Sequence, residues 1–417
     1  MIVASLSVAL TALLKEVILS TIYGILQQHI EFAALLSIII LFAPVSIILG
    51  IVSPYATRLK LVGLNKSGKV IGNLYAISTF GSIIGTFLAG FYLIPIFGNK
   101  SILYQVATVL MVISTMLINR KHYAGLVLGT TLLVFIYFAG EHFNLFKLKA
   151  LVDLDTQYSR IIVRDITDKN GRTLRTLSTD NRGLQSAIYP DNPNDLVAQY
   201  ARALRLSNKY DGKVNSALMI GGAAYTYPRD FLRNNPNSSI DVVEIDPAMT
   251  DIAKKYFFLR DDPRMTIIHQ DARLFVKRVN KKYDFVFLDA FLGLTPPPHL
   301  TTEEFMTDIR SVLANDGVLM INLYSAIEGN KSKLYTAEVN TLRKVFPHLD
   351  AYLPQKRNLS DRQSITLVAY KNIQRNELKT SDPQLSYLVS TKITFDRPLG
   401  NGQILTDDHS PVEYFAN

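Results

Sequence analysis

The sequence predicts two unlike parts: an α-helical multi-pass membrane region, then a small β-hairpin unit followed by an α/β doubly wound domain. Long apolar runs fill the first third of the 417 residues, and an Asn-Gly pair then separates two β-rich runs. From about residue 194, short apolar strands alternate with helical segments, which is typical of a mostly parallel sheet covered by helices. The expected limits are 1–142 for the membrane region, 150–184 for the hairpin unit and 185–417 for the α/β domain.

The apolar runs of the first third are each long enough to cross a bilayer, which takes about 20 residues. The first run contains Lys15 and Glu16, and it is too long and too interrupted to be a cleaved signal peptide. Gly81 and Gly85 have the spacing that lets membrane helices approach closely, although glycine also simply suits helices in lipid. The predicted spans lie near residues 3–26, 32–53, 70–97, 101–118 and 123–140.

Positive charge is concentrated in this apolar third. Residues 1–150 hold ten Lys and Arg against three Asp and Glu, whereas the remaining residues hold 34 against 32. A basic, apolar region suits contact with anionic lipid head groups, and the rest of the chain shows no basic stripe for nucleic acid. We therefore expect the lipid bilayer as a partner and no nucleic acid.

The loops between the spans give conflicting evidence on orientation. Loops 54–69 and 119–122 are both basic, so both should face the cytoplasm. Three crossing spans would then bring the chain out on the opposite side, yet the segment that follows is also basic. Either one span is misassigned or the charge rule fails here. We expect a multi-pass protein of the cell (inner) membrane with its soluble domain in the cytoplasm.

Cysteine is missing from the sequence, which excludes disulfides, thiolate metal sites and Cys nucleophiles. This composition fits a reducing compartment. The spacing of His, Asp and Glu matches no metal site, so we expect no metal.

The hairpin unit is predicted from the stretch "YSRIIVRDITDKNGRTLRTLSTD", residues 158–180. Two β-rich runs flank Asn170-Gly171, and this dipeptide is the strongest short-range hairpin signal. A small β unit is therefore expected directly before the α/β domain.

The predicted strands of the α/β domain end in residues suited to binding a ligand. They read "SALMIGG", "SIDVVEID", "MTIIHQD", "YDFVFLDAF", "GVLMINLY" and "SITLVAY". Ligands of such sheets bind at the carboxyl ends of the strands. The residues at the ends of the first four strands are Gly221 and Gly222, then Glu244 with Asp246, then Asp271, then Asp289.

This ordered set indicates a nucleoside site. Glu244 follows Gly222 by about the 20 residues expected between a glycine turn and a ribose-binding carboxylate. A carboxylate there can accept hydrogen bonds from both ribose hydroxyls, and Asp271 can accept one from the adenine amine. Each acid alone could instead cap the helix that follows it. The glycine turn alone is a weak signal, since "GGAAYT" lacks the G-x-G-x-x-G pattern.

The connection "TPPPHLTTEEF" follows the strand that carries Asp289. Its prolines make it stiff, so it either forms a gate over Asp289 or simply joins the strand to the next helix. Thr301 and Glu304 have the spacing of a capping box, which predicts that Thr301 caps that helix.

The stretches "MIGG", "VVEIDP", "DPRMTIIHQDARLFV" and "YDFVFLDAF" together resemble the spermidine synthase (polyamine aminopropyltransferase) family. That family has a methyltransferase-like Rossmann domain with a small β domain in front. "DTQYSRI", residues 155–161, resembles the entry motif of the β domain. The resemblance covers roughly residues 155–370. The helical region, with "GNLYAISTFGSIIGT", and the ending "LTDDHSPVEYF" resemble bacterial membrane-fused members of the group.

The resemblance implies a role for each matching residue. Asp289 matches the catalytic aspartate, which helps to deprotonate the attacking amine. Tyr158 in the entry motif and Gln185 just after it match substrate-binding positions. The positions that match the nucleoside site are Gly221, Gly222, Glu244, Asp246, Asp271 and Ala272.

The amine half of the family's site does not carry over. Ala224 stands where the family has an aspartate, Leu292 replaces a second acid, and Ser159 replaces a glutamine. An ammonium buried there would have fewer partners, which is costly. We hypothesise that the C-terminal tail folds over the site and that Asp407 and Asp408 supply the carboxylates. A solvated turn or helix cap before the following proline is the plainer interpretation of these two acids.

The resemblance therefore implies a membrane-anchored aminopropyltransferase. It would move the aminopropyl group of decarboxylated S-adenosylmethionine to a small-molecule amine and release methylthioadenosine. A methyltransferase that uses S-adenosylmethionine is one alternative, and a non-catalytic nucleoside-sensing module of a transporter-like membrane protein is another. Assembly as a homodimer is compatible with all three.

Overall fold

The computed structural model describes most of the chain, in two compact units. One unit comprises residues 1–149 with 155–157, and the other comprises 150–154 with 158–417. The hairpin unit and the α/β domain thus belong to one compact body. The described residues are 1–26, 30–60, 67–117, 122–142, 150–179, 183–209, 214–291, 295–355, 357–372, 380, 382–394 and 402–415.

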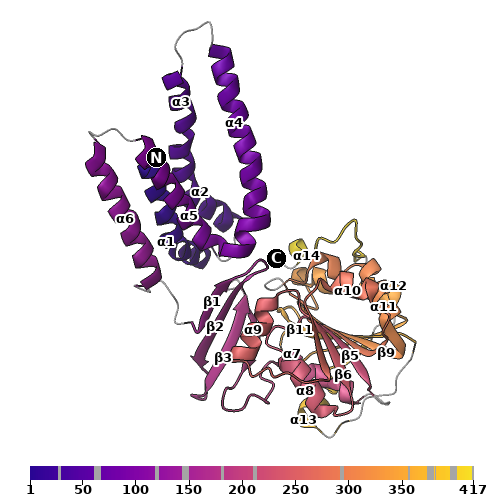
Figure 1. Cartoon of the computed structure of the whole chain (residues 1–417). Coiled ribbons are helices and arrows are strands. Elements are labelled where there is room, and N and C mark those ends of the chain that lie inside the picture. The colour runs from indigo at the N-terminus through magenta and orange to yellow at the C-terminus, as the bar shows by residue number, and fades with distance from the viewer. Residues whose placement is uncertain are drawn as a thin grey trace. The chain divides into compact units, whose positions relative to one another are not determined.

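Up to residue 142, every element of the first unit in the described part of the chain is a helix (Figure 1). Its elements are α1 (Ile2–Ile25), α2 (Ile30–Gly50), α3 (Val52–Lys60), α4 (Ser67–Leu88), a π-helical turn (Ala89–Leu93), α5 (Ile94–Leu117) and α6 (Tyr123–His142). Among the described residues, five helical stretches are long and apolar enough to cross a membrane, the number that the sequence predicts. They are Ile2–Ile25, Glu31–Lys60, Gly68–Leu93, Ile96–Leu117 and Tyr123–Gly140.

Helix α1 forms the packed centre of this unit, in contact with α2, α5 and α6. Its Ser5 hydroxyl donates to the carbonyl oxygen of Ala107 at 2.6 Å, so the two backbones lie close together. Gly81 and Gly85 on α4 form no close helix contact within the described part of this chain. No heavy atom there lies within 4 Å of where a Cβ on either glycine would stand.

The small β unit is a four-stranded antiparallel sheet in the order β1-β2-β3-β4. The predicted hairpin joins β2 to β3, and Asp168 shapes its turn by accepting the backbone N–H groups of Asn170 and Arg172, both at 2.8 Å. Strand β4 runs past residue 184, the expected end of this unit. The four strands are β1 (Val152–Asp155), β2 (Arg160–Thr167), β3 (Thr173–Thr179) and β4 (Leu184–Ile188).

The α/β domain is built on an eight-stranded mixed sheet in the order β12-β10-β11-β9-β8-β5-β6-β7. Strands β9, β8, β5, β6 and β7 run parallel, as predicted, and the other three pair antiparallel. The strands are β5 (Ser216–Ile220), β6 (Ser239–Val243), β7 (Met265–Ile268), β8 (Tyr283–Leu288), β9 (Leu313–Ser325), β10 (His348–Tyr352), β11 (Gln363–Tyr370) and β12 (Ile393–Thr394).

The strand order reverses between β5 and β8, which brings the ends of these two strands together. The sheet edge beside such a reversal is where ligands of α/β folds bind. Figure 1 shows helices on both faces of the sheet. Alternate residues of β5 enter the two cores: Leu218 and Ile220 pack on one face, and Ala217 and Met219 pack on the other.

The helices of this domain follow the strands as the alternating pattern predicts. The α-helices between β5 and β10 are α8 (Thr226–Asn234), α9 (Pro247–Tyr256), α10 (Ala272–Arg278), α11 (Glu303–Val312) and α12 (Lys333–Val345). The short helix α7 (Gln199–Ala203) and the 3₁₀ turn η4 (Leu204–Lys209) precede β5, and the 3₁₀ turn η5 (Pro298–Leu300) precedes α11. The remaining ones are η6 (Asn330–Ser332), α13 (Pro383–Ser390) and α14 (Val412–Phe415).

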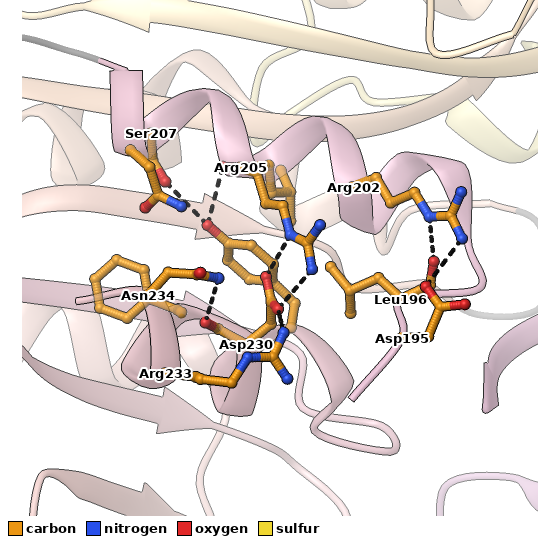
Figure 2. Close-up of polar contacts among 12 residues, drawn as sticks. Asp195, Leu196, Arg202, Arg205, Ser207, Asp230, Arg233 and Asn234 are labelled. Atoms are coloured by element: carbon orange, nitrogen blue, oxygen red, sulfur yellow. Dashed lines mark hydrogen bonds and ion pairs between the residues drawn. The ribbon is translucent and has the colours of Figure 1, made fainter. Parts of the chain in front are cut away.

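A buried ion pair fastens α8, the helix after the glycine turn, to the segment that precedes β5 (Figure 2). Asp230 on α8 is 2% exposed, and Arg205 donates to both of its carboxylate oxygens, at 2.7 and 2.8 Å. Arg233, one turn later on α8, pairs with the same carboxylate. Such a two-pronged contact fixes orientation as well as distance, so it holds α8 against the 3₁₀ turn η4 that carries Arg205.

Candidate active site at the carboxyl edge of the sheet

The glycine turn after β5 lies directly against the end of β8. Gly221 has a φ of +93°, and a Cβ at this position would lie 2.2 Å from the carbonyl oxygen of Asp289. Ala223 and Tyr225 also adopt positive φ, at 44° and 54°. The left-handed region costs a non-glycine residue about 1–2 kcal/mol. The turn is therefore a strained backbone segment, held in place by its surroundings.

Glu244, at the end of β6, holds this turn in place. Its Oε2 accepts the backbone N–H groups of Gly222 and Ala223 at 2.9 and 3.0 Å, and its Oε1 accepts that of Asp246 at 3.0 Å. A carboxylate has about four acceptor positions. With three taken, Glu244 keeps roughly one position on Oε1 for a ligand, so a second ribose hydroxyl needs another acceptor or a shift of the turn.

Asp246 and Asp271 both cap helices, as the plainer interpretation predicts, and both lie at the same edge of the sheet. Asp246 accepts the N–H of Ala248 at 3.0 Å, and Asp271 accepts that of Leu274 at 3.0 Å. The second oxygen of Asp271 lies 3.0 Å from Nε2 of His299. Ala272 begins α10 and is buried. Helix capping does not exclude ligand binding, because a carboxylate has about four acceptor positions.

Asp289 follows β8 and reaches the centre of this edge. Its backbone N–H donates to Ile220 at 2.9 Å, and its Oδ1 accepts the side-chain amide of Asn322 on β9 at 2.8 Å. Burial raises the pKa of Asp289 to about 6, against the lowering effect of the Asn322 hydrogen bond. A carboxylate with such a pKa is ionised at neutral pH and is suited to take up a proton.

Tyr158 and Gln185 come from the small β unit and flank these acids. Burial, and then the charges of Asp246 and Asp271, raise the pKa of the Tyr158 phenol, which places this residue near both carboxylates. The carbonyl oxygen of Gln185 accepts the hydroxyl of Tyr200 at 2.7 Å.

Tyr200 and Asn322 are two residues of this edge that the sequence did not single out. Burial, with the charge of Asp289 as the second cause, raises the pKa of Tyr200 well above its usual range. Tyr200 on α7 therefore lies near Asp289, as Asn322 does. The sequence could have indicated Asn322, because it is a single amide inside the apolar strand "VLMINLY". Nothing in the sequence indicates Tyr200, since a tyrosine in an amphipathic helix is ordinary.

The three departures from the family pattern have different outcomes. Ala224 is fully buried in an apolar cluster with Ile161 and Val163 of β2 and Met249 of α9, so an aspartate there would be desolvated. Ser159 is partly buried at the start of β2. Leu292 lies outside the described residues.

The C-terminal tail lies along the connection after β8. Arg273 on α10 donates to both carboxylate oxygens of Asp407, and Thr302 donates to Oδ1 at 2.8 Å. This pairing lowers the pKa of Asp407. Asp407 and Asp408 are both exposed, but within the described residues only Asp407 is held by an ion pair. The tail therefore anchors through the first acid of the pair and leaves the second one accessible.

The connection after β8 is fixed by the same tail. The hydroxyls of Thr301 and Ser410 lie 3.0 Å apart, and Ser410 also donates to the carbonyl oxygen of Pro298 at 3.2 Å. The predicted helix cap was one residue early: Thr302, not Thr301, accepts the N–H of Phe305 at the start of α11. Thr301 instead bonds the tail. Within the described residues, no group of His, Asp and Glu could hold a metal ion.

Comparisons with known proteins show what this part of the chain is similar to. Residues 205–379 match the model of the spermine/spermidine synthase domain. A polyamine aminopropyltransferase of Vibrio vulnificus (strain CMCP6) is 34% identical over 193 residues, which is 44% of this chain and 62% of that protein. A probable polyamine aminopropyl transferase of Bifidobacterium longum (strain NCC 2705) is 25% identical over 276 residues, which is 61% of this chain and 60% of the relative. The aligned parts thus span about three fifths of these relatives.

Among solved structures, the crystal structure of a probable spermidine synthase from Corynebacterium glutamicum ATCC 13032 is 22% identical. It aligns over 62% of this chain and 91% of its own length, with a TM-score of 0.45.

Proposed function

We propose that this chain, whose residues 205–379 match the model of the spermine/spermidine synthase domain, transfers the aminopropyl group of decarboxylated S-adenosylmethionine to a small amine. One observation carries the proposal: Asp289 stands beside the glycine turn with a pKa of about 6, and its Oδ1 is already occupied by Asn322. Within the described residues, its Oδ2 has no hydrogen bond, so this oxygen is left for the substrate.

The residues around the glycine turn fit the nucleoside of the donor. Gly221 allows the glycine turn to lie directly against the backbone of Asp289, and Oε1 of Glu244 keeps one acceptor position for a ribose hydroxyl. Asp271, with Ala272 beside it, is the acceptor for the adenine amine. Asp246 lies between them and close to Tyr158. These assignments follow the order of the strand ends along the sheet.

In the proposed reaction, Asp289 takes the proton that the amine nitrogen loses. That nitrogen forms a bond to the aminopropyl carbon, the carbon–sulfur bond breaks, and the electron pair leaves with sulfur to give methylthioadenosine. Such an in-line displacement depends chiefly on positioning. Tyr158 and Gln185 would orient the reacting groups, and the exposed Asp408 would receive an ammonium of the amine. Asp407 contributes by holding the tail to Arg273.

The five long apolar helices would anchor this domain to the cell (inner) membrane, with the domain on the cytoplasmic side. Their length and composition support the anchoring. Assembly as a homodimer stays a prediction.

The test uses the full-length chain in detergent, incubated with decarboxylated S-adenosylmethionine and a panel of mono- and diamines. Release of methylthioadenosine, followed by mass spectrometry, is the expected result. A parallel incubation with S-adenosylmethionine checks for methyl transfer, which would release S-adenosylhomocysteine instead. The proposal fails if only S-adenosylhomocysteine forms. If neither product forms while the nucleoside still binds, a sensing role becomes the better account.

A further inference from the structure

A small cavity lies next to Asn322, the residue whose side-chain amide donates to Asp289. It is lined by apolar residues of β8, β9 and the connection after β8, together with three polar residues, Thr301, Asn322 and Glu338. The Thr301 hydroxyl is already hydrogen-bonded to Pro298 and Ser410, which leaves Asn322 and Glu338. The free volume of the cavity is about 10 Å³, close to the smallest space that holds one water molecule. The cavity thus suits a water molecule between two polar groups and is too small for a substrate.

Glu338 is an unusual residue to find there. It lies on α12 between Leu334 and Leu342, each one helical turn away, so its side chain is on the apolar stripe of the helix. Glu338 is 2% exposed. Among the described residues its Oε2 has no hydrogen-bond partner, and neither has Oδ1 of Asn322. A buried polar atom without a partner lowers the stability of the fold by about 1–3 kcal/mol. Because two residues of the same cavity each have such an atom, we look for one hydrogen-bonded network that satisfies both.

The two atoms complement each other if Glu338 is in its acid form. Burial raises the pKa of Glu338 to about 8, so at neutral pH the carboxyl group carries a proton and can donate it in a hydrogen bond. Oδ1 of Asn322 can only accept. One water molecule that accepts from Glu338 and donates to Asn322 would satisfy both groups.

The consequence reaches Asp289. Asn322 must present its nitrogen to Asp289, which it does at 2.8 Å, and not its oxygen, which would repel the carboxylate. A donor on the other side of the amide selects this orientation. We propose that Glu338 is a positioning residue for Asp289: through a water molecule in this cavity it holds the Asn322 amide with its nitrogen toward Asp289. The inference rests on the proposed role of Asp289 as the base.

The test compares three variants of the full-length chain in detergent by methylthioadenosine release. Glu338→Leu removes the donor, and we expect kcat to fall about tenfold while the KM values for amine and donor stay within about twofold. Glu338→Gln keeps an N–H donor of similar shape, and we expect kcat within about twofold of the wild type. Val339→Ala, a cavity-forming change at the next residue of α12, is the packing control and should leave kcat nearly unchanged.

Two results would overturn the inference. If Glu338→Gln and Glu338→Leu both raise the KM for the amine and leave kcat intact, Glu338 binds the amine directly. If Glu338→Leu lowers kcat no more than Val339→Ala does, Glu338 only fills space.

A second measurement does not depend on turnover. Thermal unfolding of Glu338→Leu, Asn322→Leu and the double variant forms a double-mutant cycle. If the two side chains share one hydrogen-bonded network, the double variant loses less in Tm than the sum of the single losses. Additive losses would refute the link between them. If the wild type releases no methylthioadenosine, the proposed function fails, and this cycle still decides whether Glu338 and Asn322 act together.

Discussion

The two halves of the site use the same side-chain type in opposite ways. On the β6 and β7 side, Glu244 accepts three backbone N–H groups, and Asp246 and Asp271 each accept one from a helix start. On the β8 and β9 side, Asp289 accepts one amide and Glu338 has an oxygen without a partner in the described structure. A carboxylate that accepts several backbone N–H groups stays ionised and acts as a fixed hydrogen-bond acceptor. A carboxylate that is buried with few donors has a raised pKa and can therefore take up a proton.

The largest expected effect tests the proton-accepting half. Asp289→Asn removes the base but keeps the shape, so we expect kcat for aminopropyl transfer to fall about 10²- to 10⁴-fold. Nucleoside affinity, measured by isothermal titration calorimetry, should change by less than about threefold, because Asp289 is not its ligand. If Asp289→Asn weakened nucleoside affinity as much as it lowered kcat, Asp289 would also contribute to nucleoside binding, and the two halves would not have separate roles. In the wild type, kcat should also decline as the pH falls through about 6, where Asp289 becomes protonated.

The next effect tests the hydrogen-bonding half. Glu244→Gln replaces one acceptor oxygen by an N–H₂ group that opposes the N–H groups of the glycine turn. We expect the nucleoside Kd to rise about 10- to 100-fold, since hydrogen bonds to charged groups contribute about 1.5–3 kcal/mol.

Asp284→Asn is the matched control for that variant. Asp284 also accepts two backbone N–H groups, those of Asn215 and Ser216 at 2.8 and 3.0 Å, but it lies at the opposite edge of the sheet. Its nucleoside Kd should equal that of the wild type. A similar rise in both variants would mean that general loosening of the sheet, and not a lost ligand contact, weakens binding.

The pH dependence of stability tests whether Glu338 belongs to the proton-accepting half of the site. Its pKa is about 8 in the folded chain, above its ordinary value of 4.5. The folded state therefore binds this proton more tightly than the unfolded state does. The stability from this proton is fully present below about pH 4.5, declines as the pH rises and is lost above about pH 8, and it amounts to at most about 5 kcal/mol.

Glu338→Gln has no titrating group at this position. The difference between its Tm and that of the wild type should therefore rise in favour of the variant from pH 5 to pH 8, and should stay constant above pH 8. Differential scanning fluorimetry in detergent measures the difference, with Val339→Ala as the control that keeps the wild-type slope. Parallel Tm curves for the wild type and Glu338→Gln would show that Glu338 does not carry the extra proton.

The smallest effects are expected in the tail. Asp408→Asn should raise the KM for a diamine about threefold if the exposed carboxylate meets its distal ammonium. Asp407→Asn breaks a partly exposed pair with Arg273, which is worth about 0–1 kcal/mol, and should act mainly on Tm. Kinetic assays with a monoamine and a diamine separate the two roles. The tail has no part in amine binding if neither variant changes the diamine KM.

Much of the fold could be read from the sequence because it depends on local patterns. The strand runs, the Asn170-Gly171 hairpin and the five apolar helices each follow from periodicity or turn chemistry within about 20 residues. The placement of the acids after β6, β7 and β8 was also predictable. These acids stand at strand ends, and the parallel arrangement places such ends along one edge whatever the details of packing.

The β8 and β9 side of the site depends on contacts between segments far apart in the chain. Asn322 bonds Asp289 across 33 residues, and Tyr200 comes from a helix before the sheet begins. Glu338 left a signal, an acid on the apolar stripe of "KLYTAEVNTLRKV", but only the packed structure shows what it faces. The helix cap was misplaced by one residue because the tail, more than 100 residues away, engages Thr301.

Gly221 has a consequence for how such an enzyme can diversify. Any side chain at this position would press on the carbonyl oxygen of Asp289, so a substitution would force the ends of β5 and β8 apart together. A lineage that acquires a new acceptor therefore has little freedom at this junction. The exposed tail tolerates single replacements more readily. Divergence in substrate choice should accumulate there, while the junction of the two strands stays as it is.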